Sequence, residues 1–345
     1  MQKLSDQRYQ RQTLLPEVGA AGQQLIAQAK VLVVGAGGLG HPVIQYLAAA
    51  GIGTLAICDH DKVELSNLQR QILFKTQDIG QQKASLACQA VRELNPDVQV
   101  CAIEQRLAAS NILEILRPYQ IIIDCSDNFK TKFTIHDACF FLKKRLIQGS
   151  IYQFEGQLQN FHFKDAQAPC LRCLWQQVPS AEVTGNCGTA GVLGVIPGVL
   201  GGLQCNEALK TILQLETLKP GQTLTLNLKN YQLSTLNWKK NPHCPLCSPL
   251  ASIKTIAQSI PLKEYELTHI SDHFVTVDIR SYAEIKKSPF AIHCPLASID
   301  QLEICADKTY LFICQKGIRG EKLVAELRKK GQSNTYSLAG GADAL

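Results

Sequence analysis

Cysteines in this 345-residue chain occur at spacings that suit metal binding and thiol chemistry. Two CxxC pairs, Cys170 with Cys173 and Cys244 with Cys247, enclose a long segment that contains a further cysteine, Cys187. A CxxC turn lets two thiolates bind one metal ion, and two such pairs make the closed tetrahedral site of structural Zn²⁺. The alternatives are four unrelated buried thiols or a redox CxxC motif. The presence of two pairs favours zinc.

A glycine-rich turn lies upstream of these thiols and suits phosphate binding. Gly35, Gly37, Gly38 and Gly40 form a GxGxxG pattern directly after a run of β-branched residues. Without side chains there, backbone N–H groups can approach phosphate, and the N-terminus of the next helix adds positive potential. Asp59 follows about twenty residues later, where an acidic residue bonds a ribose hydroxyl. The pattern alone fits NAD, FAD and ATP.

Charged residues further along narrow the choice of nucleotide. Arg70, in the polar loop that follows Asp59, and Lys83, at a helix start, are cations suited to a triphosphate. Asp127, followed by Asn128 at a strand end, is an oxygen ligand suited to Mg²⁺. Any one of them alone reads as a surface charge. Because they converge on the carboxyl ends of strands, they favour a nucleoside triphosphate over a dinucleotide.

The elements that position these residues alternate between strand and helix. Strands are expected over 30–35, 54–58, 98–104 and 121–125, and helices over 39–50, 81–94 and 107–116. This alternation predicts an α/β fold with a Rossmann-like, mostly parallel sheet and helices on both faces. Residues 152–163 alternate as in an antiparallel hairpin, which adds an antiparallel portion.

Residues beyond the second cysteine pair predict a separate domain. Expected strands at 275–279 and 310–314 precede an expected helix at 321–329, which indicates a small α/β domain. The predicted organisation is therefore a nucleotide-binding domain with a zinc site over 1–248, a linker over 249–262 and a second domain over 263–345.

Composition excludes several function classes. The 35 Lys and Arg residues exceed the 29 Asp and Glu residues only slightly and are scattered, which argues against nucleic-acid binding. The uncharged stretch 187–205 is diluted by glycine and Pro197, so a membrane span is not favoured. Fourteen cysteines without an apolar leader indicate a reducing, cytoplasmic location. The thiols interpreted as ordinary core residues are Cys58, Cys88, Cys101, Cys125, Cys139 and Cys205.

Residues 5–248 resemble the ThiF/MoeB family, prokaryotic relatives of the ubiquitin-activating enzymes, which adenylate the C-terminal glycine of small ubiquitin-like sulfur carriers. The matching segments, in family order, are 8–12, 35–40, 59–71, 80–84, 124–129, 169–174, 186–198 and 241–247. Two departures are small. His41 stands where a small residue is common and is interpreted as solvent-facing, and Lys132 replaces a frequent arginine.

The resemblance implies a role for each matching position. Asp59 would bind the ribose of ATP, Lys83 would contact its phosphates and Asp127 would bind Mg²⁺. Arg11 resembles an arginine that family dimers lend to the neighbouring subunit, which implies a homodimer. Cys187 resembles a cysteine proposed to link covalently with the carrier or to carry a persulfide; a packing role is the alternative. The implied nucleotide-binding set is Gly35, Gly37, Gly38, Gly40, Asp59, Asp61, Ser66, Asn67, Leu68, Gln69, Arg70, Lys83, Asp127 and Asn128.

The C-terminal residues resemble rhodanese-like domains. The segments 275–280 and 311–320 match the strand that ends in Asp-x-Arg and the active-site loop, in which Cys314 would carry sulfane sulfur. Backbone N–H groups curled around that sulfur would stabilise an anion, and Arg280 and Arg319 would add positive charge. Gly320 stands where serine is usual, and the segment 292–296 departs from the family pattern. A Cys314 that merely packs is the alternative.

Together these features predict an adenylyltransferase and sulfurtransferase that uses ATP, Mg²⁺ and Zn²⁺. Its partners would be a ubiquitin-like sulfur carrier ending in Gly-Gly and a persulfide donor, and its product a thiocarboxylate for molybdopterin, thiamine or thiolated tRNA. One alternative is a non-catalytic carrier-binding protein. The other is a nicotinamide oxidoreductase, against which the 66–70 loop, Lys83 and the lack of an evident hydride-relay residue argue.

Overall fold

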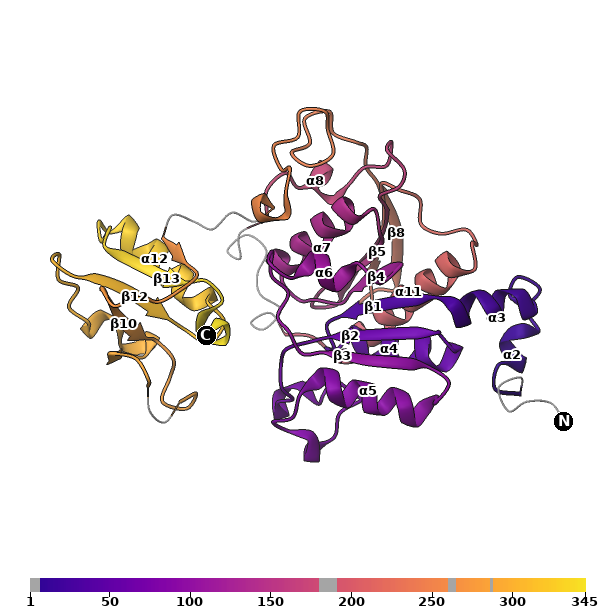
Figure 1. Cartoon of the computed structure of the whole chain (residues 1–345), viewed down its shortest axis with the longest axis horizontal. Helices are drawn as coiled ribbons and strands as arrows, with labels where there is room; N and C mark the ends of the chain where they lie inside the picture. The colour runs from indigo at the N-terminus through magenta and orange to yellow at the C-terminus, as the bar shows by residue number, and fades with distance from the viewer. Residues whose placement is uncertain (1–6, 180–190, 260–264, 286–287) are drawn as a thin grey trace. The chain divides into compact units, whose positions relative to one another are not determined.

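The computed structural model describes residues 7–179, 191–259, 265–285 and 288–345. The chain forms two compact units, Met1–Ile260 and Pro261–Leu345. Each unit contains its own sheet, and Figure 1 shows both. Cys187 lies outside the described residues.

The first unit is built on an eight-stranded sheet in the order β3-β2-β1-β4-β5-β6-β7-β8. Neighbours from β3 to β5 are parallel, whereas β6, β7 and β8 add an antiparallel extension. The predicted α/β class, mostly parallel with an antiparallel portion, is confirmed. The strands are β1 Lys30–Val34, β2 Thr54–Cys58, β3 Gln99–Ile103, β4 Ile121–Asp124, β5 Arg145–Tyr152, β6 Glu155–His162, β7 Gln222–Asn227 and β8 Gln232–Asn237.

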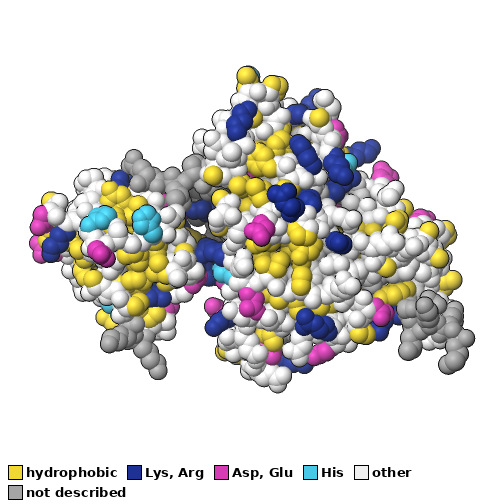
Figure 2. All heavy atoms as spheres, in the orientation of Figure 1, with side chains coloured by type: hydrophobic (Ala, Val, Ile, Leu, Met, Phe, Trp, Pro, Cys, Tyr) yellow, Lys and Arg dark blue, Asp and Glu magenta, His cyan; other side chains and the backbone are white. Residues whose placement is uncertain are grey.

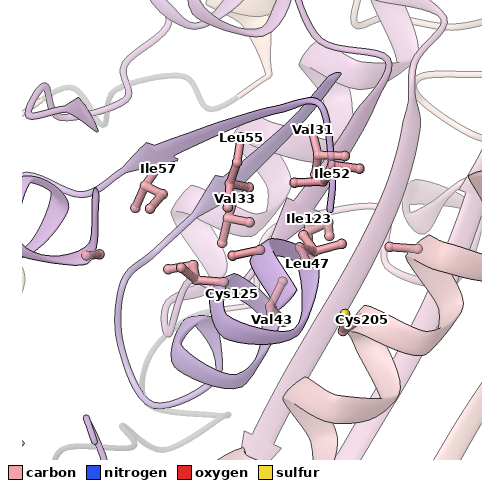
Figure 3. Close-up of a cluster of buried hydrophobic side chains, with 14 of the residues drawn as sticks. Val31, Val33, Val43, Leu47, Ile52, Leu55, Ile57, Ile123, Cys125 and Cys205 are labelled. Carbon is pink, nitrogen blue, oxygen red and sulfur yellow. The ribbon is translucent and has the colours of Figure 1, made fainter. Parts of the chain in front are cut away.

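Helices cover both faces of this sheet (Figure 1). Val31 and Val33 of β1 face the core beneath α4, α5 and α11, and Figure 3 shows them packed with Val43 and Leu47. Leu32 and Val34 face the opposite core, beneath α6 and α7. A strand buried on both faces needs a continuous apolar run, and β1 has one. The helices are α2 Gln10–Thr13, α3 Gly19–Gln28, α4 Gly40–Ala50, α5 Lys83–Leu94, α6 Ile112–Leu116, α7 Phe129–Leu142, α8 Leu171–Leu174 and α11 Val195–Ile212.

Residues 249–259, expected to begin a linker, pack on the first unit. Ile253 and Ile256 are buried in the core that contains α6 and α7, and the short 3-10 helix η3 Ile256–Gln258 contacts α7.

Cys101 is not the buried core thiol that the sequence predicted. It is exposed because β3 is the edge strand of the sheet.

The second unit is a five-stranded parallel sheet in the order β11-β10-β12-β13-β9. The helix α12, Ile318–Lys329, packs on β12 and β13. The small 3-10 helices η4 Leu296–Gln301 and η5 Gly341–Ala344 border the carboxyl ends of the strands. The strands are β9 Glu266–Leu267, β10 Phe274–Asp278, β11 Ile292–His293, β12 Thr309–Ile313 and β13 Thr335–Leu338.

Two surface properties bear on function. Across the described ranges, every helix is too short or too polar to cross a membrane. On the face shown in Figure 2, Lys and Arg side chains lie singly or in small groups among apolar and uncharged residues. That face therefore lacks the continuous basic surface that nucleic acid would require.

Candidate functional site

The glycine turn joins β1 to α4 and abuts the end of β4. Gly35 has a φ of 98°, and a Cβ placed there would lie 2.8 Å from the Cys125 carbonyl oxygen. A Cβ on Gly40 would lie 2.0 Å from the Gly35 carbonyl oxygen. Both positions therefore exclude any side chain. The close approach also puts the turn beside the segment that follows β4, at the point where the strand order reverses direction, which is where doubly wound folds bind ligands.

Asp59, at the end of β2, ties the neighbouring loops together. Its Oδ2 accepts a hydrogen bond of 2.7 Å from the backbone N–H of Ala36, inside the glycine turn, and its Oδ1 accepts one of 2.8 Å from Asp61 N–H. Burial raises the pKa of Asp59, while the Lys83 charge and both N–H groups act in the opposite direction. A carboxylate has about four acceptor positions, so Asp59 retains capacity for a ribose hydroxyl.

Two predicted cations lie at this edge of the sheet. Lys83 begins α5, is buried, and has its Nζ 3.8 Å from Asp61 Oδ2. Arg70 is half-buried, and its Cγ would lie 3.4 Å from a Cβ on Gly38. Its Nη1 donates to the Ser66 carbonyl oxygen over 3.0 Å. The two cations thus come from different segments: Arg70 lies against the glycine turn, and Lys83 pairs with the segment that Asp59 bonds to it.

The start of α11 packs against the loop from Ser66 to Gln69 and against the glycine turn. A Cβ on Gly194 would lie 2.2 Å from the Gln69 carbonyl oxygen, and one on Gly38 would lie 3.0 Å from Pro197 Cγ. Asn67 is buried within this loop, and its carbonyl oxygen accepts from Arg70 N–H and Gln71 N–H. These contacts fix the backbone from which Arg70 projects.

Asp127 and Asn128 follow β4 at the same edge. Asp127 is exposed, while Asn128 accepts a hydrogen bond from Thr131 N–H and caps the N-terminus of α7. An exposed carboxylate beside a phosphate-binding turn can take part in Mg²⁺ binding without breaking an internal ion pair. The structure therefore brings Asp127 to the edge that carries Asp59 and Gly35.

A buried polar cluster beneath this edge was missed by sequence reasoning. Asp124 is fully buried; its Oδ1 accepts from Ser126 and its Oδ2 from Gln148 Nε2 over 2.8 Å. Lys132 is also buried, with its Nζ 3.5 Å from Asp124 Oδ2 and donating to the Gly149 carbonyl oxygen. The sequence offered one signal for this cluster: Asp124 directly follows three consecutive isoleucines at the end of a strand. Lys132 therefore replaces arginine at a structural position that supports the β4 end.

His41 is not solvent-facing, contrary to expectation. Its side chain is fully buried between the glycine turn and the loop after Arg70. Nε2 lies 3.0 Å from the Ala36 carbonyl oxygen, and Nδ1 accepts a 2.9 Å hydrogen bond from Leu73 N–H. The expectation was wrong because the first turn of α4 packs against residues 71–74, a contact that local sequence does not encode.

Arg11 lies at the far end of α4 from the glycine turn. The neighbouring Gln12 donates to the Ala50 carbonyl oxygen over 3.0 Å, and the Tyr9 ring packs against Gly51. The 11 residues of α4 separate these contacts from the turn, about 16 Å at the helical rise per residue. Arg11 is exposed there, so the chain does not bring this arginine to its own nucleotide site.

The four paired cysteines converge on one point, as their spacing predicted. The sulfur of Cys170 lies 3.9 Å from that of Cys173 and 3.5 Å from that of Cys244, and Cys173 lies 3.3 Å from Cys247. All four sulfur atoms lie within 4.8 Å of one another. Four thiolates bound tetrahedrally at a Zn–S distance of about 2.3 Å would stand about 3.8 Å apart, so the cluster fits Zn²⁺ after small adjustments.

A buried ion pair joins this cysteine cluster to helix α7 within the first unit. Arg172, between the two ligands of its pair, donates to Asp137 Oδ2 and to the Ser259 carbonyl oxygen. His136 accepts a 2.8 Å hydrogen bond from Leu171 N–H. Burial pushes the pKa of Asp137 upward, but hydrogen bonds from His136 and Arg172 outweigh it and lower the pKa.

The Cys314 loop forms a separate site in the second unit. The buried Cys314 sulfur accepts from Gly320 N–H at 3.4 Å, and a Cβ on Gly341 would lie 2.2 Å from the Cys314 carbonyl oxygen. A Cβ on Gly320 would lie 3.0 Å from the Phe312 carbonyl oxygen, so a side chain there would require the neighbouring backbone to shift slightly. The backbone thus approaches the sulfur closely.

Both arginines near Cys314 are paired with carboxylates. Arg280 makes two hydrogen bonds to Asp278, of 2.9 and 2.8 Å. Arg319, which also interacts with Cys314, contacts both carboxylate oxygens of Glu284 and lowers the Glu284 pKa to about 2. Within the described residues, carboxylates therefore largely neutralise the positive charge expected near Cys314.

A mostly apolar cavity of about 390 Å³ adjoins Arg319. It is lined by Ile279, Ser281, Pro295, Leu296, Ala297 and Arg319.

This geometry defines an α/β protein with a glycine turn at the topological switch point of its sheet and four cysteines that could hold a metal ion. The model of the ThiF family matches residues 9–246, and the chain belongs to that family. It is 45% identical to the sulfur carrier protein adenylyltransferase of Thermus thermophilus over 243 residues, which cover 70% of this chain and 90% of that protein. It is 35% identical to the adenylyltransferase and sulfurtransferase MOCS3-2 of Drosophila pseudoobscura pseudoobscura, with 96% of this chain and 78% of that protein covered.

Solved structures agree on the fold of the first unit. The Escherichia coli MccB structure with MccA-N7isoASN matches with a TM-score of 0.64 and 18% identity, over 71% of this chain and 75% of that one. At that identity the match speaks for the fold alone. The longer MOCS3-2 match extends across both units.

Proposed function

We propose that this protein activates a ubiquitin-like sulfur carrier with ATP and then replaces the activating group with sulfur. In the first step, a carboxylate oxygen of the carrier's terminal glycine attacks the α-phosphorus of ATP. The bond to the β-phosphate oxygen breaks, pyrophosphate leaves, and a carrier acyl-adenylate forms. The observation that carries this proposal is that Arg70 lies against the glycine turn, while Lys83 pairs with Asp61 in the segment that Asp59 bonds to that turn.

The residues at this edge suit the electrostatics of that step. A carboxylate and a triphosphate are both anionic, so the site must place positive charge where negative charge accumulates. Arg70 and Lys83 would contact the phosphates, and Asp59 would accept from the ribose. Asp127 would help to hold Mg²⁺, which neutralises phosphate charge. No covalent enzyme intermediate is needed.

The four-cysteine cluster would hold a structural Zn²⁺. With four thiolates, the site leaves no open coordination position, so its role is to fix the surrounding loops. Arg172 and the Cys170 and Cys244 backbones would be ordered by the metal. The contacts of Arg172 with Asp137 and Ser259 transmit that order to α7 and to the end of the first unit.

Sulfur transfer would follow at Cys314. A persulfide donor passes its outer sulfur to the Cys314 thiolate and leaves as a thiolate. The Cys314 persulfide then attacks the acyl-adenylate carbonyl and displaces AMP, which gives an acyl disulfide. Attack by a Cys187 thiolate on the Cys314 sulfur would release the carrier thiocarboxylate and leave a protein disulfide, which an external thiol reduces.

Pyrophosphate exchange tests the first step directly. Purified protein with Mg²⁺, ATP and a Gly-Gly carrier should exchange labelled pyrophosphate into ATP. Arg70→Ala should lower the exchange rate about 100-fold or more, since it removes one charge from the developing anion. Arg92→Ala, at an exposed position of α5, is the matched control. Absence of exchange with every Gly-Gly carrier tested would refute adenylation.

Cysteine variants separate the two steps. Cys314→Ala should retain pyrophosphate exchange but lose persulfide transfer, because adenylation does not use that thiol. Cys187→Ala should also retain exchange and accumulate the acyl disulfide, which intact-mass spectrometry detects. Loss of exchange in Cys314→Ala would contradict the assignment of separate steps to separate sites.

A further inference from the structure

The environment of His41 determines a single protonation state. Leu73 N–H is a donor, so the Nδ1 that faces it at 2.9 Å must be an acceptor. The ring proton is therefore on Nε2, which donates to the Ala36 carbonyl oxygen over 3.0 Å. Burial lowers the pKa of His41 to about 3, and the Lys83 charge contributes in the same direction. A neutral imidazole of one tautomer bridges two backbone segments.

The first of these segments is the glycine turn. The Ala36 carbonyl and the Gly37 N–H belong to one trans peptide and point in opposite directions. Because His41 holds the carbonyl, it also sets the direction of the Gly37 N–H. The preceding peptide is held by Asp59, which accepts from Ala36 N–H. The two side chains together fix both polar groups of Ala36.

The second segment carries Arg70. Leu73 lies three residues after Arg70, within a run of turns in which Gln71 N–H donates to Asn67 and Phe74 N–H donates to Gln71. The His41 ring also packs edge-on against Phe74, with ring centroids 4.5 Å apart. His41 therefore joins the loop that presents Arg70 to the turn that lies beside it.

We propose that His41 is a positioning residue for the nucleotide site, a neutral cross-brace that aligns the Gly37 N–H with the Arg70 guanidinium. The proposal rests on the proposed function insofar as the ligand between these groups is ATP. His41 itself does not reach the reacting atoms. It acts through the peptide after Ala36 and through the loop 70–74.

Three substitutions resolve the two halves of the brace. His41→Phe keeps a buried ring and loses both hydrogen bonds. His41→Gln can still donate to Ala36, and His41→Asn can still accept from Leu73. We expect His41→Phe to raise the Kd for ATP with Mg²⁺ about tenfold or more, because two buried hydrogen bonds are lost. Gln and Asn should each recover part of that loss, because each retains one of the two hydrogen bonds.

His136→Gln is the control for a merely structural effect. His136 is equally buried in the same unit and also accepts from a backbone N–H, but beneath the cysteine cluster. The His136→Gln variant should have a lower melting temperature but the wild-type Kd for ATP. Nucleotide affinity is measured by calorimetry without carrier. If His41→Phe fails to fold, a folded His41→Gln or His41→Asn variant still tests the proposal.

The outcomes separate this proposal from the proposed function. Wild-type protein that binds ATP, with His41 variants that bind it equally well, would overturn the role of His41 and leave adenylation standing. Wild-type protein that binds no nucleotide would overturn both. A wild-type Kd for ATP that changes near pH 6.5 and becomes flat in His41→Gln would also overturn it, because the brace requires a neutral ring throughout that range.

Discussion

Charge near Cys314 is decided by two carboxylates that pair with the neighbouring arginines. Arg319 sits next to the thiol, yet Glu284 occupies its guanidinium, and Asp278 does the same for Arg280. A dianionic donor such as thiosulfate would meet little uncompensated charge there, whereas an alkyl persulfide has the neighbouring apolar cavity available.

Glu284→Gln should therefore raise thiosulfate sulfurtransferase activity, because it frees the Arg319 guanidinium to meet the anion. We expect kcat/KM for thiosulfate to rise by roughly 1.5- to fivefold, the effect of one exposed charge contact. Glu303→Gln, at another exposed acidic position of the same unit, should leave that ratio unchanged. An unchanged rate in Glu284→Gln would show that Arg319 is not accessible to the donor.

His41 also makes a pH-dependent contribution to stability. Its pKa is lowered from 6.5 to about 3 in the folded state, so the unfolded chain binds the extra proton. The contribution is complete above pH 6.5 and is lost as pH falls from 6.5 toward 3. Between pH 7 and pH 4.5 the wild-type protein should lose about 2 to 3 kcal/mol through this residue. Urea titrations of His41→Gln should show a correspondingly smaller loss.

At the scale of elements, α11 shows how tertiary contact overrides local preference. Its glycines and Pro197 disfavour a helix, and sequence reasoning did not predict one. The reason for glycine is the close approach to α4: a Cβ on Gly201 would lie 2.4 Å from both the Leu39 carbonyl oxygen and Pro42 Cγ. Strands β1, β2 and β4, by contrast, could be predicted because each is a short apolar run buried on both faces.

Alanine substitutions along α11 test this reading. Gly201→Ala should lower the free energy of unfolding by about 1 to 3 kcal/mol, since the methyl group meets a backbone carbonyl and a proline ring, neither of which can swing away. Gly198→Ala and Gly202→Ala, where a Cβ meets nothing within 4 Å, should be neutral or stabilising by up to about 1 kcal/mol. Equal effects at the three positions in chemical unfolding would contradict the packing argument.

The cysteine cluster could be predicted because both halves are local turns whose spacing alone fixes the ligands. Its attachment through Arg172, Asp137 and Ser259 could not, since those residues are distant in sequence.

Cys244→Ser should reduce bound zinc from about one ion per chain to near none and lower the melting temperature by several degrees or more. Cys101→Ser, exposed on an edge strand, should do neither. Metal content by mass spectrometry and a thermal melt measure both.

At the scale of the whole molecule, a homodimer, as the resemblance implies, would offer Arg11 a nucleotide site that its own chain does not. The residue lies at the far end of α4 from its own glycine turn, so it can serve a nucleotide site only in a partner subunit. Arg11→Ala and Lys83→Ala should each abolish most pyrophosphate exchange. Mixed and refolded together, they should regain up to about a quarter of wild-type activity, because half of the chains pair as heterodimers with one intact site each. No recovery on mixing would refute the shared site.

The residues of the proposed nucleotide site can be named from the sequence, but the contacts that hold them in place cannot. Asp59, Arg70, Lys83 and Asp127 follow from motif and position, because parallel strands deliver their carboxyl ends to one edge. The residues that hold them, such as Asp124, do not carry a local signal beyond a strand end. Sequence patterns indicate which side chains contact a ligand. They indicate much less readily which other side chains hold these ligand-contacting residues in place.

The double anchoring of Ala36 has a consequence for how ATP binds. Asp59 fixes one side of this residue and His41 the other, and both contacts are made by the protein's own side chains. The phosphate-binding backbone is therefore preorganised. An incoming nucleotide loses its own freedom but need not order the loop that receives it, so its affinity reflects electrostatic fit rather than induced folding.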